Sequence, residues 1–126
     1  MPDPDHPGQP PVLDEATLAE LSASVEGDRA FVVELINAYL ADGGAQVDAI
    51  EAAIAADDAE ALVRPAHTLK SSSATVGALR LAAASRELEM ASRSGSIGSD
   101  SAATLRSDWD AAVAALGAWV AAEEAR

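Results

Sequence analysis

The feature that most constrains the fold of this chain is its alanine content. Alanine accounts for 31 of the 126 residues, whereas Phe, Trp and Tyr together make up only 3%. Alanine has the highest helix propensity of all residues, and the chain has few of the alternating Val- and Ile-rich runs that form strands. A chain of this length has room for one domain with a single core. The composition therefore predicts an all-α domain.

Apolar residues at helical spacing, separated by turn residues, predict five helical segments. The first is short, about 15–25, with Asp14 as a candidate N-cap and Leu18, Leu21 and Val25 facing inward. The others span about 29–56, 59–76, 78–94 and 100–124. Four long helices with short connections predict an up-down antiparallel four-helix bundle with a short additional N-terminal helix.

Two places in this pattern are irregular. Gly43-Gly44 interrupts the second segment, where we expect a kink or a split, since each glycine costs up to about 1 kcal/mol against alanine. Pro65 predicts that the third segment bends or is irregular in its first part. The inward residues expected on the second segment are Phe31, Leu35, Ala38 or Tyr39, Asp42, Val47, Ile50 and Ile54, and on the last Leu105, Trp109, Val113, Leu116 and Val120.

Charge and composition indicate which kinds of partner and which location the chain can have. The net charge of −13 argues against nucleic acid and against anionic membranes as partners. Residues 1–11 contain five of the six prolines and predict a disordered tail, which includes His6, ahead of a bundle over 12–126. The chain has no cysteine, no signal-peptide pattern and no run of about 20 apolar residues, so the expected location is the cytoplasm.

The segment from Ala66 to Ala78 contains the most informative motif. At 3.6 residues per turn, His67, Lys70, Ser71 and Ala74 share one face of a helix, beside a stripe of core residues. The imidazole is therefore expected next to a cation and among small side chains. This arrangement can present a nucleophile to a visiting protein.

The turn at Gly77 predicts which residues face His67 from the next helix. Residue 67 lies about ten positions before this turn, so its neighbours should lie a similar distance beyond it. Arg86, Glu89 and Arg93 occupy that window on one helical face. Glu89 is the candidate to accept a hydrogen bond from the imidazole and so to fix its tautomer.

These residues resemble the motif of the histidine-containing phosphotransfer (HPt) family of two-component phosphorelays. That motif reads approximately His-x-Leu-Lys-Gly-Ser, followed by Gly-Ala. The resemblance covers about residues 13–95, and the family more often has glycine where this chain has Ser71. The matching residues are His67, Leu69, Lys70, Ser72, Gly77 and Ala78.

The resemblance implies that His67 accepts a phosphoryl group from a receiver-domain aspartate and passes it to another receiver. Lys70 and Arg93 would offset the transferred charge, and Glu89 would orient the ring. A receiver would dock over Ser71 and Ala74, where small side chains leave room. The expected partners are response-regulator receivers and a hybrid histidine kinase, and the chain is expected to be a monomer.

The sequence indicates no autonomous catalysis, since it contains no phosphate-binding glycine loop or nucleotide-kinase motif. No metal ligands and no cofactor are expected in this chain, and Mg²⁺ is expected on the partner receiver. Two alternatives remain open. One is a non-catalytic helical adaptor with a vestigial motif, and the other is a domain cut from a larger hybrid kinase whose linker is the proline-rich start.

Overall fold

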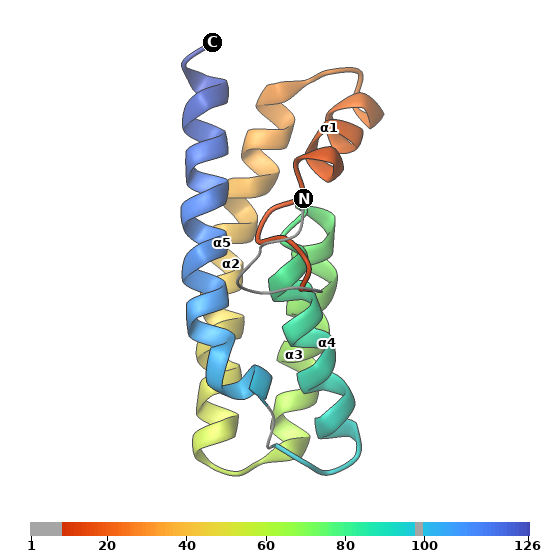
Figure 1. Ribbon diagram of the computed structural model, residues 1–126, viewed down its shortest axis with the longest axis vertical. Coiled ribbons are helices and arrows are strands. Elements are labelled where there is room, and N and C mark those ends of the chain that lie inside the picture. Colours follow the sequence, from red (N-terminus) through yellow and green to blue (C-terminus); the bar gives the residue numbers. More distant parts are fainter. Residues whose placement is uncertain (1–8, 98–99) are drawn as a thin grey trace.

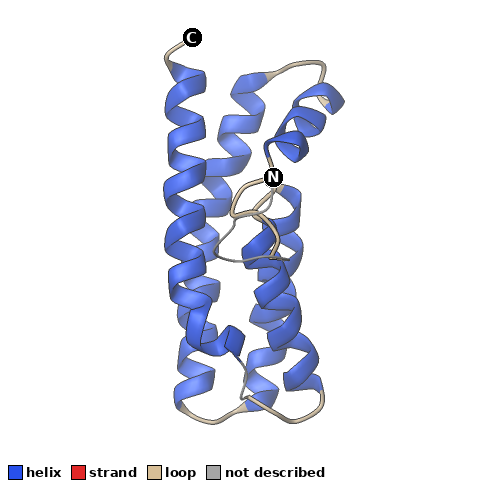
Figure 2. Ribbon diagram, in the orientation of Figure 1, coloured by secondary structure: helices blue, strands red, loops and turns tan. Residues whose placement is uncertain are grey.

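The computed structural model describes residues 9–97 and 100–126, and all of its regular secondary structure is α-helix. No strand occurs among these residues (Figure 2). The helices are α1 (Glu15–Ser24), α2 (Arg29–Ala55), α3 (Ala59–Thr75), α4 (Leu79–Arg93) and α5 (Asp100–Glu124). The all-α prediction is therefore confirmed, and the predicted ends lie within one residue of those observed. No helix in the described part is long and apolar enough to cross a bilayer.

The four long helices run along the long axis of the molecule, with α1 beside one end of α2 (Figure 1). Helix α3 packs against α2 and α4, and α5 closes the bundle against α2 and α4. The core is made of the inward aliphatic side chains of all five helices, of Tyr39 on α2 and of Trp109 on α5. Short connections force consecutive long helices to be antiparallel, which produces the up-down order.

Local sequence signals set the ends of α2 and α3. The carboxylates of Asp28 and Asp58 accept hydrogen bonds from the backbone N–H groups of Phe31 and Ala61, as N-caps do. Asp14 also precedes a helix, but its side chain accepts from the Thr17 hydroxyl instead of a backbone N–H. Gly77 ends α3 with a φ of +82°, a conformation that glycine adopts at little cost.

The structure corrects the predicted interior of α2. The helix is continuous from Arg29 to Ala55, so the predicted split at the two glycines was wrong, whereas the alternative, a kink there, stays a prediction. A Cβ at Gly43 would lie 2.6 Å from a Trp109 ring atom, so this glycine makes room for the indole. Phe31 is 45% exposed, and Asp42 is also exposed. The buried positions of α2 are instead Val32, Ile36, Tyr39, Gly43, Val47, Ile50 and Ala53. In the first half of α2, the inward positions were therefore predicted one residue too early in the sequence.

Helix α3 is helical on both sides of Pro65, so the irregular first part was wrong, whereas the alternative, a bend at Pro65, stays a prediction. Proline cannot donate the hydrogen bond that the carbonyl of Ala61 would accept in an unbroken helix. Ala61 is exposed, so water can bond to this carbonyl. Pro65 itself is buried, and its ring contributes to the interior two residues before His67.

The remaining predictions concern α5 and the proposed N-terminal tail. On α5, Val113 is 37% exposed and not inward, whereas Leu105, Trp109, Leu116 and Val120 are buried as expected. Residues 1–8, with His6, lie outside the described part of the chain. In the described remainder of the proposed tail, Pro10 and Pro11 accept hydrogen bonds from Arg80 on α4. The boundary between tail and bundle at residue 11 stays a prediction.

Candidate functional site

His67 on α3 lies opposite Glu89 on α4, and the two side chains are in contact. Nδ1 of the imidazole is 2.8 Å from Oε2 of the carboxylate. The His67 side chain is 55% exposed, whereas that of Glu89 is 6% exposed. The turn at Gly77 and the buried Leu69 and Leu88 set the register of the two helices. The structure thus brings together the pair that the sequence predicted.

Two cations also reach the Glu89 carboxylate. Nζ of Lys70 is 2.6 Å from Oε1, and Nη2 of Arg93 is 2.8 Å from Oε2. Arg93 also donates from Nε to Oε2, at 3.1 Å. These contacts compensate a carboxylate that is removed from water, as a buried charge requires. The predicted trio of Lys70, Glu89 and Arg93 is therefore one connected cluster around His67.

The electrostatics of Glu89 follow from these contacts. The hydrogen bond from Lys70 is the largest cause that lowers the pKa of Glu89, from 4.5 to about 2, and Arg93 and His67 add to it. Burial acts in the opposite direction but is outweighed. At neutral pH the carboxylate is ionised and can only accept hydrogen bonds. The contact at Nδ1 is therefore donated by the imidazole.

This donation determines which ring nitrogen of His67 can react. A neutral imidazole has one N–H and one lone pair, so a proton held on Nδ1 leaves the lone pair on Nε2. The exposed side chain makes the ring accessible to another protein. The arrangement is a solvent-accessible nitrogen nucleophile, held in one tautomer by a buried carboxylate and flanked by positive charge.

The face of α3 beside His67 is open and has small side chains. Ser71 and Ala74 are exposed, as predicted, and the Ser71 hydroxyl makes no hydrogen bond within residues 9–97 and 100–126, although the Ser71 carbonyl accepts one from the Thr75 hydroxyl. Arg86 differs from the prediction. It is exposed and makes no side-chain hydrogen bond or ion pair with any described residue, so only Glu89 and Arg93 of the predicted window join the cluster.

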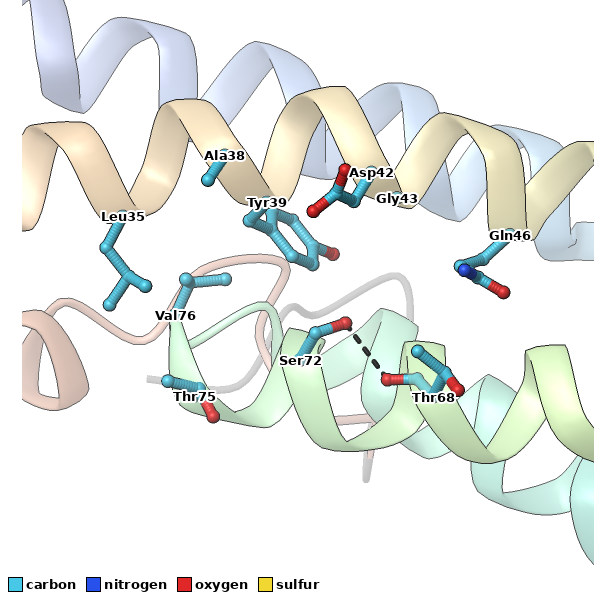
Figure 3. A pocket seen from close by; sticks show the side chains of 10 residues that line it. All are labelled: Leu35, Ala38, Tyr39, Asp42, Gly43, Gln46, Thr68, Ser72, Thr75 and Val76. Atoms are coloured by element: carbon cyan, nitrogen blue, oxygen red, sulfur yellow. Dashed lines mark hydrogen bonds between the residues drawn. The ribbon is translucent and has the colours of Figure 1, made fainter.

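A groove between α2 and α3 adjoins this face (Figure 3). It has a volume of about 310 Å³, and its rim includes Thr68, the residue after His67. The hydroxyl of Tyr39, which lines the groove, is 2.7 Å from the hydroxyl of the buried Ser73, and burial raises the pKa of Tyr39 to about 12. The lining residues are Leu35, Ala38, Tyr39, Asp42, Gly43, Gln46, Thr68, Ser72, Thr75 and Val76.

Sequence reasoning missed two features of this region. The Tyr39–Ser73 hydrogen bond joins residues 34 positions apart, and no local signal predicts it. Arg64, exposed and one turn before His67 on α3, could have been found from its spacing of three residues. Within the described residues, no three His, Cys, Asp or Glu side chains form a group that could hold a metal ion.

Comparisons with known proteins agree with this geometry. The family model described as Hpt domain matches residues 34–119, which is more than half of the chain. The structure is similar to the crystal structure of histidine-containing phosphotransfer protein B (HptB) from Pseudomonas aeruginosa PAO1, with a TM-score of 0.78 and 26% identity. The match covers 87% of this chain and 95% of that one. No curated protein sequence matches the chain significantly.

Proposed function

This chain belongs to the Hpt domain family, whose members transfer phosphoryl groups through a histidine in phosphorelays, and from this premise we propose that His67 is its phosphoryl acceptor. In the proposed reaction His67 takes the phosphoryl group from the aspartyl phosphate of one receiver domain and passes it to the aspartate of another. The observation that supports this most strongly is the hydrogen bond between His67 Nδ1 and the buried Glu89 carboxylate. In the neutral imidazole this bond leaves the lone pair on Nε2, and the side chain is open to a partner.

The proposed transfer involves one bond formed and one broken. The lone pair on Nε2 attacks phosphorus, the P–O bond to the aspartate breaks, and the aspartate leaves as a carboxylate. The ring then bears a positive charge, with its proton still on Nδ1 beside Glu89. A carboxylate at 2.8 Å stabilises that charge, and transfer to the next receiver reverses the same steps.

The proposed docking surface consists of Ser71, Ala74 and the adjoining groove between α2 and α3. Its support is the openness of this face, where small side chains flank the imidazole. In this proposal the receivers and a hybrid histidine kinase are the partners, and the chain acts as a monomer. The receiver supplies Mg²⁺, and the chain itself contributes the nucleophile, its orientation and the neighbouring cations.

The direct test is incubation of the full chain with a panel of phosphorylated receivers. We expect transfer of a label that is acid-labile and alkali-stable, as a phosphoramidate is and an aspartyl phosphate is not. The variant His67→Gln should take up no label, and ATP with Mg²⁺ should not label the chain alone. Binding of receivers without any transfer would instead support the non-catalytic adaptor.

The docking surface can be tested separately at Ser71. We expect Ser71→Trp to block transfer, because the indole would occupy the space beside His67, while helicity by circular dichroism stays at the wild-type level. The matched variant Ser71→Gly should transfer at the wild-type rate or faster, with a loss of up to about 1 kcal/mol in stability. Wild-type transfer by Ser71→Trp would show that the partner docks elsewhere.

A further inference from the structure

The basic side chains of this chain divide into those with partners and those without. All eight Lys and Arg residues lie within the described ranges. Six make ion pairs or hydrogen bonds through their side chains: Arg29, Lys70, Arg80, Arg93, Arg106 and Arg126. Arg64 and Arg86 make none with any residue in 9–97 or 100–126. Two unpaired arginines in a chain with a net charge of −13 call for a physical explanation.

Arg64 lies on the same helix as His67 and one turn before it. Residues three apart on a helix are neighbours on its surface. Helical side chains also lean toward the N-terminus, so a residue covers the turn that precedes its own Cα. The imidazole of His67 therefore leans toward the turn that presents Arg64, and both side chains are exposed.

The other cations of the site are already engaged. Lys70 and Arg93 both bind the carboxylate of Glu89, which is 6% exposed. If either cation turned toward a phosphoryl group, a buried carboxylate would lose part of its compensation, which is costly. Arg64 can turn toward the ring without breaking any contact within the described part of the chain.

Arg64 also has the chemistry that a phosphoryl group requires. Nδ1 of His67 is occupied by Glu89, so a phosphoryl group on Nε2 would lie on the exposed side of the ring. Guanidinium presents two parallel N–H groups to phosphate oxygens, and it remains charged at every physiological pH. We propose that Arg64 binds the phosphoryl group of phosphorylated His67, as a phosphoryl-binding residue supplied by α3 itself. This inference rests on the proposed function of His67.

The test is a ³¹P NMR titration of the phosphorylated full chain, with phosphoramidate as the small-molecule donor. A guanidinium beside the phosphoryl group favours the dianionic form of that group. Arg64→Ala should therefore raise the midpoint of the last ionisation of the phosphoryl group by about 0.5 to 1 pH unit. Arg64→Lys should give a smaller rise, because it keeps the charge but loses the paired donors. The other charged groups around the ring, Glu89, Lys70 and Arg93, are the same in every variant.

Arg86→Ala is the matched control. It removes the same charge from an exposed arginine that also has no partner among the described residues, but it lies on α4 rather than on the helix that carries His67. Its midpoint should stay at the wild-type value. An unchanged midpoint in Arg64→Ala, or an equal rise in both variants, would overturn the proposal. A receiver panel that transfers nothing to His67 would refute the proposed function instead, whatever this titration shows.

Discussion

The ion cluster between α3 and α4 and the one between α5 and α2 contain the same kinds of charge in opposite surroundings. In the first, His67, Lys70 and Arg93 converge on Glu89, whose side chain is 6% exposed. In the second, Arg106 on α5 pairs with Asp48 and Glu51 on α2. There the Arg106, Asp48 and Glu51 side chains are 46%, 74% and 41% exposed.

This difference shows how burial changes what an ion pair does. Glu51 and, to a smaller extent, Asp48 raise the pKa of Arg106, but a guanidinium is charged at physiological pH with or without them. Water screens such exposed pairs, and each contributes about 0–1 kcal/mol. Glu89 must keep its partners because it is out of water, so its contacts fix the ring of His67. The exposed cluster only joins α5 to α2, whereas the buried cluster also sets the tautomer of His67.

The largest effect should follow removal of the buried carboxylate. Glu89→Ala would release Nδ1 of His67 and leave Lys70 and Arg93 without their acceptor. We expect transfer from a receiver to fall on the order of 10²-fold, as for other losses of orientation at a reacting atom. Rates of label transfer at saturating receiver would measure this. Transfer within twofold of wild type would show that Glu89 does not orient the ring.

A change where α2 packs against α5 should lower the stability of the fold. Gly43→Ala places a Cβ 2.6 Å from the Trp109 ring, so the free energy of unfolding should fall by about 1–3 kcal/mol. Gly44→Ala is the matched control, because its nearest ring atom is 3.9 Å away. That variant should be neutral or more stable by up to about 1 kcal/mol. Urea denaturation measures both, and equal losses would contradict the packing described at Gly43.

The fold was predictable from sequence where local signals decide it. Alanine content, apolar residues at helical spacing and the glycine turn at residue 77 predicted the helices and the α3–α4 pairing. The phase of α2 was not predictable in the same way. A small residue is needed at Gly43 because Trp109, distant in sequence, packs there.

The site shows the same division between local and long-range information. The motif and the turn predicted that His67 and Glu89 face each other, and the contact at 2.8 Å agrees. The engagement of Lys70 depends on the burial of Glu89, which spacing does not reveal. Lys70 was therefore interpreted as a cation for the transferred group, although it binds Glu89 in the unphosphorylated chain.

Low pH should weaken the buried cluster, because it protonates the Glu89 carboxylate and removes its contribution to stability. Because the folded-state pKa is lowered to about 2 from 4.5, the ionised carboxylate stabilises the fold above pH 4.5. This contribution is lost as the pH falls from about 4.5 to about 2. Denaturation of wild type and Glu89→Gln across this range should show the two stabilities converging as the pH falls. A constant difference would mean that the Glu89 pKa is not lowered on folding.

The smallest effect should come from the exposed cluster. Arg106→Ala should lower the free energy of unfolding by less than about 1 kcal/mol and leave transfer to His67 unchanged. Moderate salt should remove most of that difference, because exposed pairs are screened. Urea denaturation at low and high ionic strength provides the measurement. A salt-independent loss of several kcal/mol would contradict the contrast between the two clusters.

The central claim is that Glu89 holds the proton on Nδ1, so that His67 reacts through Nε2. The most direct measurement is a long-range ¹H–¹⁵N NMR spectrum of the histidine-labelled chain, before and after transfer from a phosphorylated receiver. We expect a proton on Nδ1 in the unphosphorylated protein and coupling of phosphorus to Nε2 after transfer. A proton on Nε2 before transfer, or phosphorus bonded to Nδ1 afterwards, would contradict it.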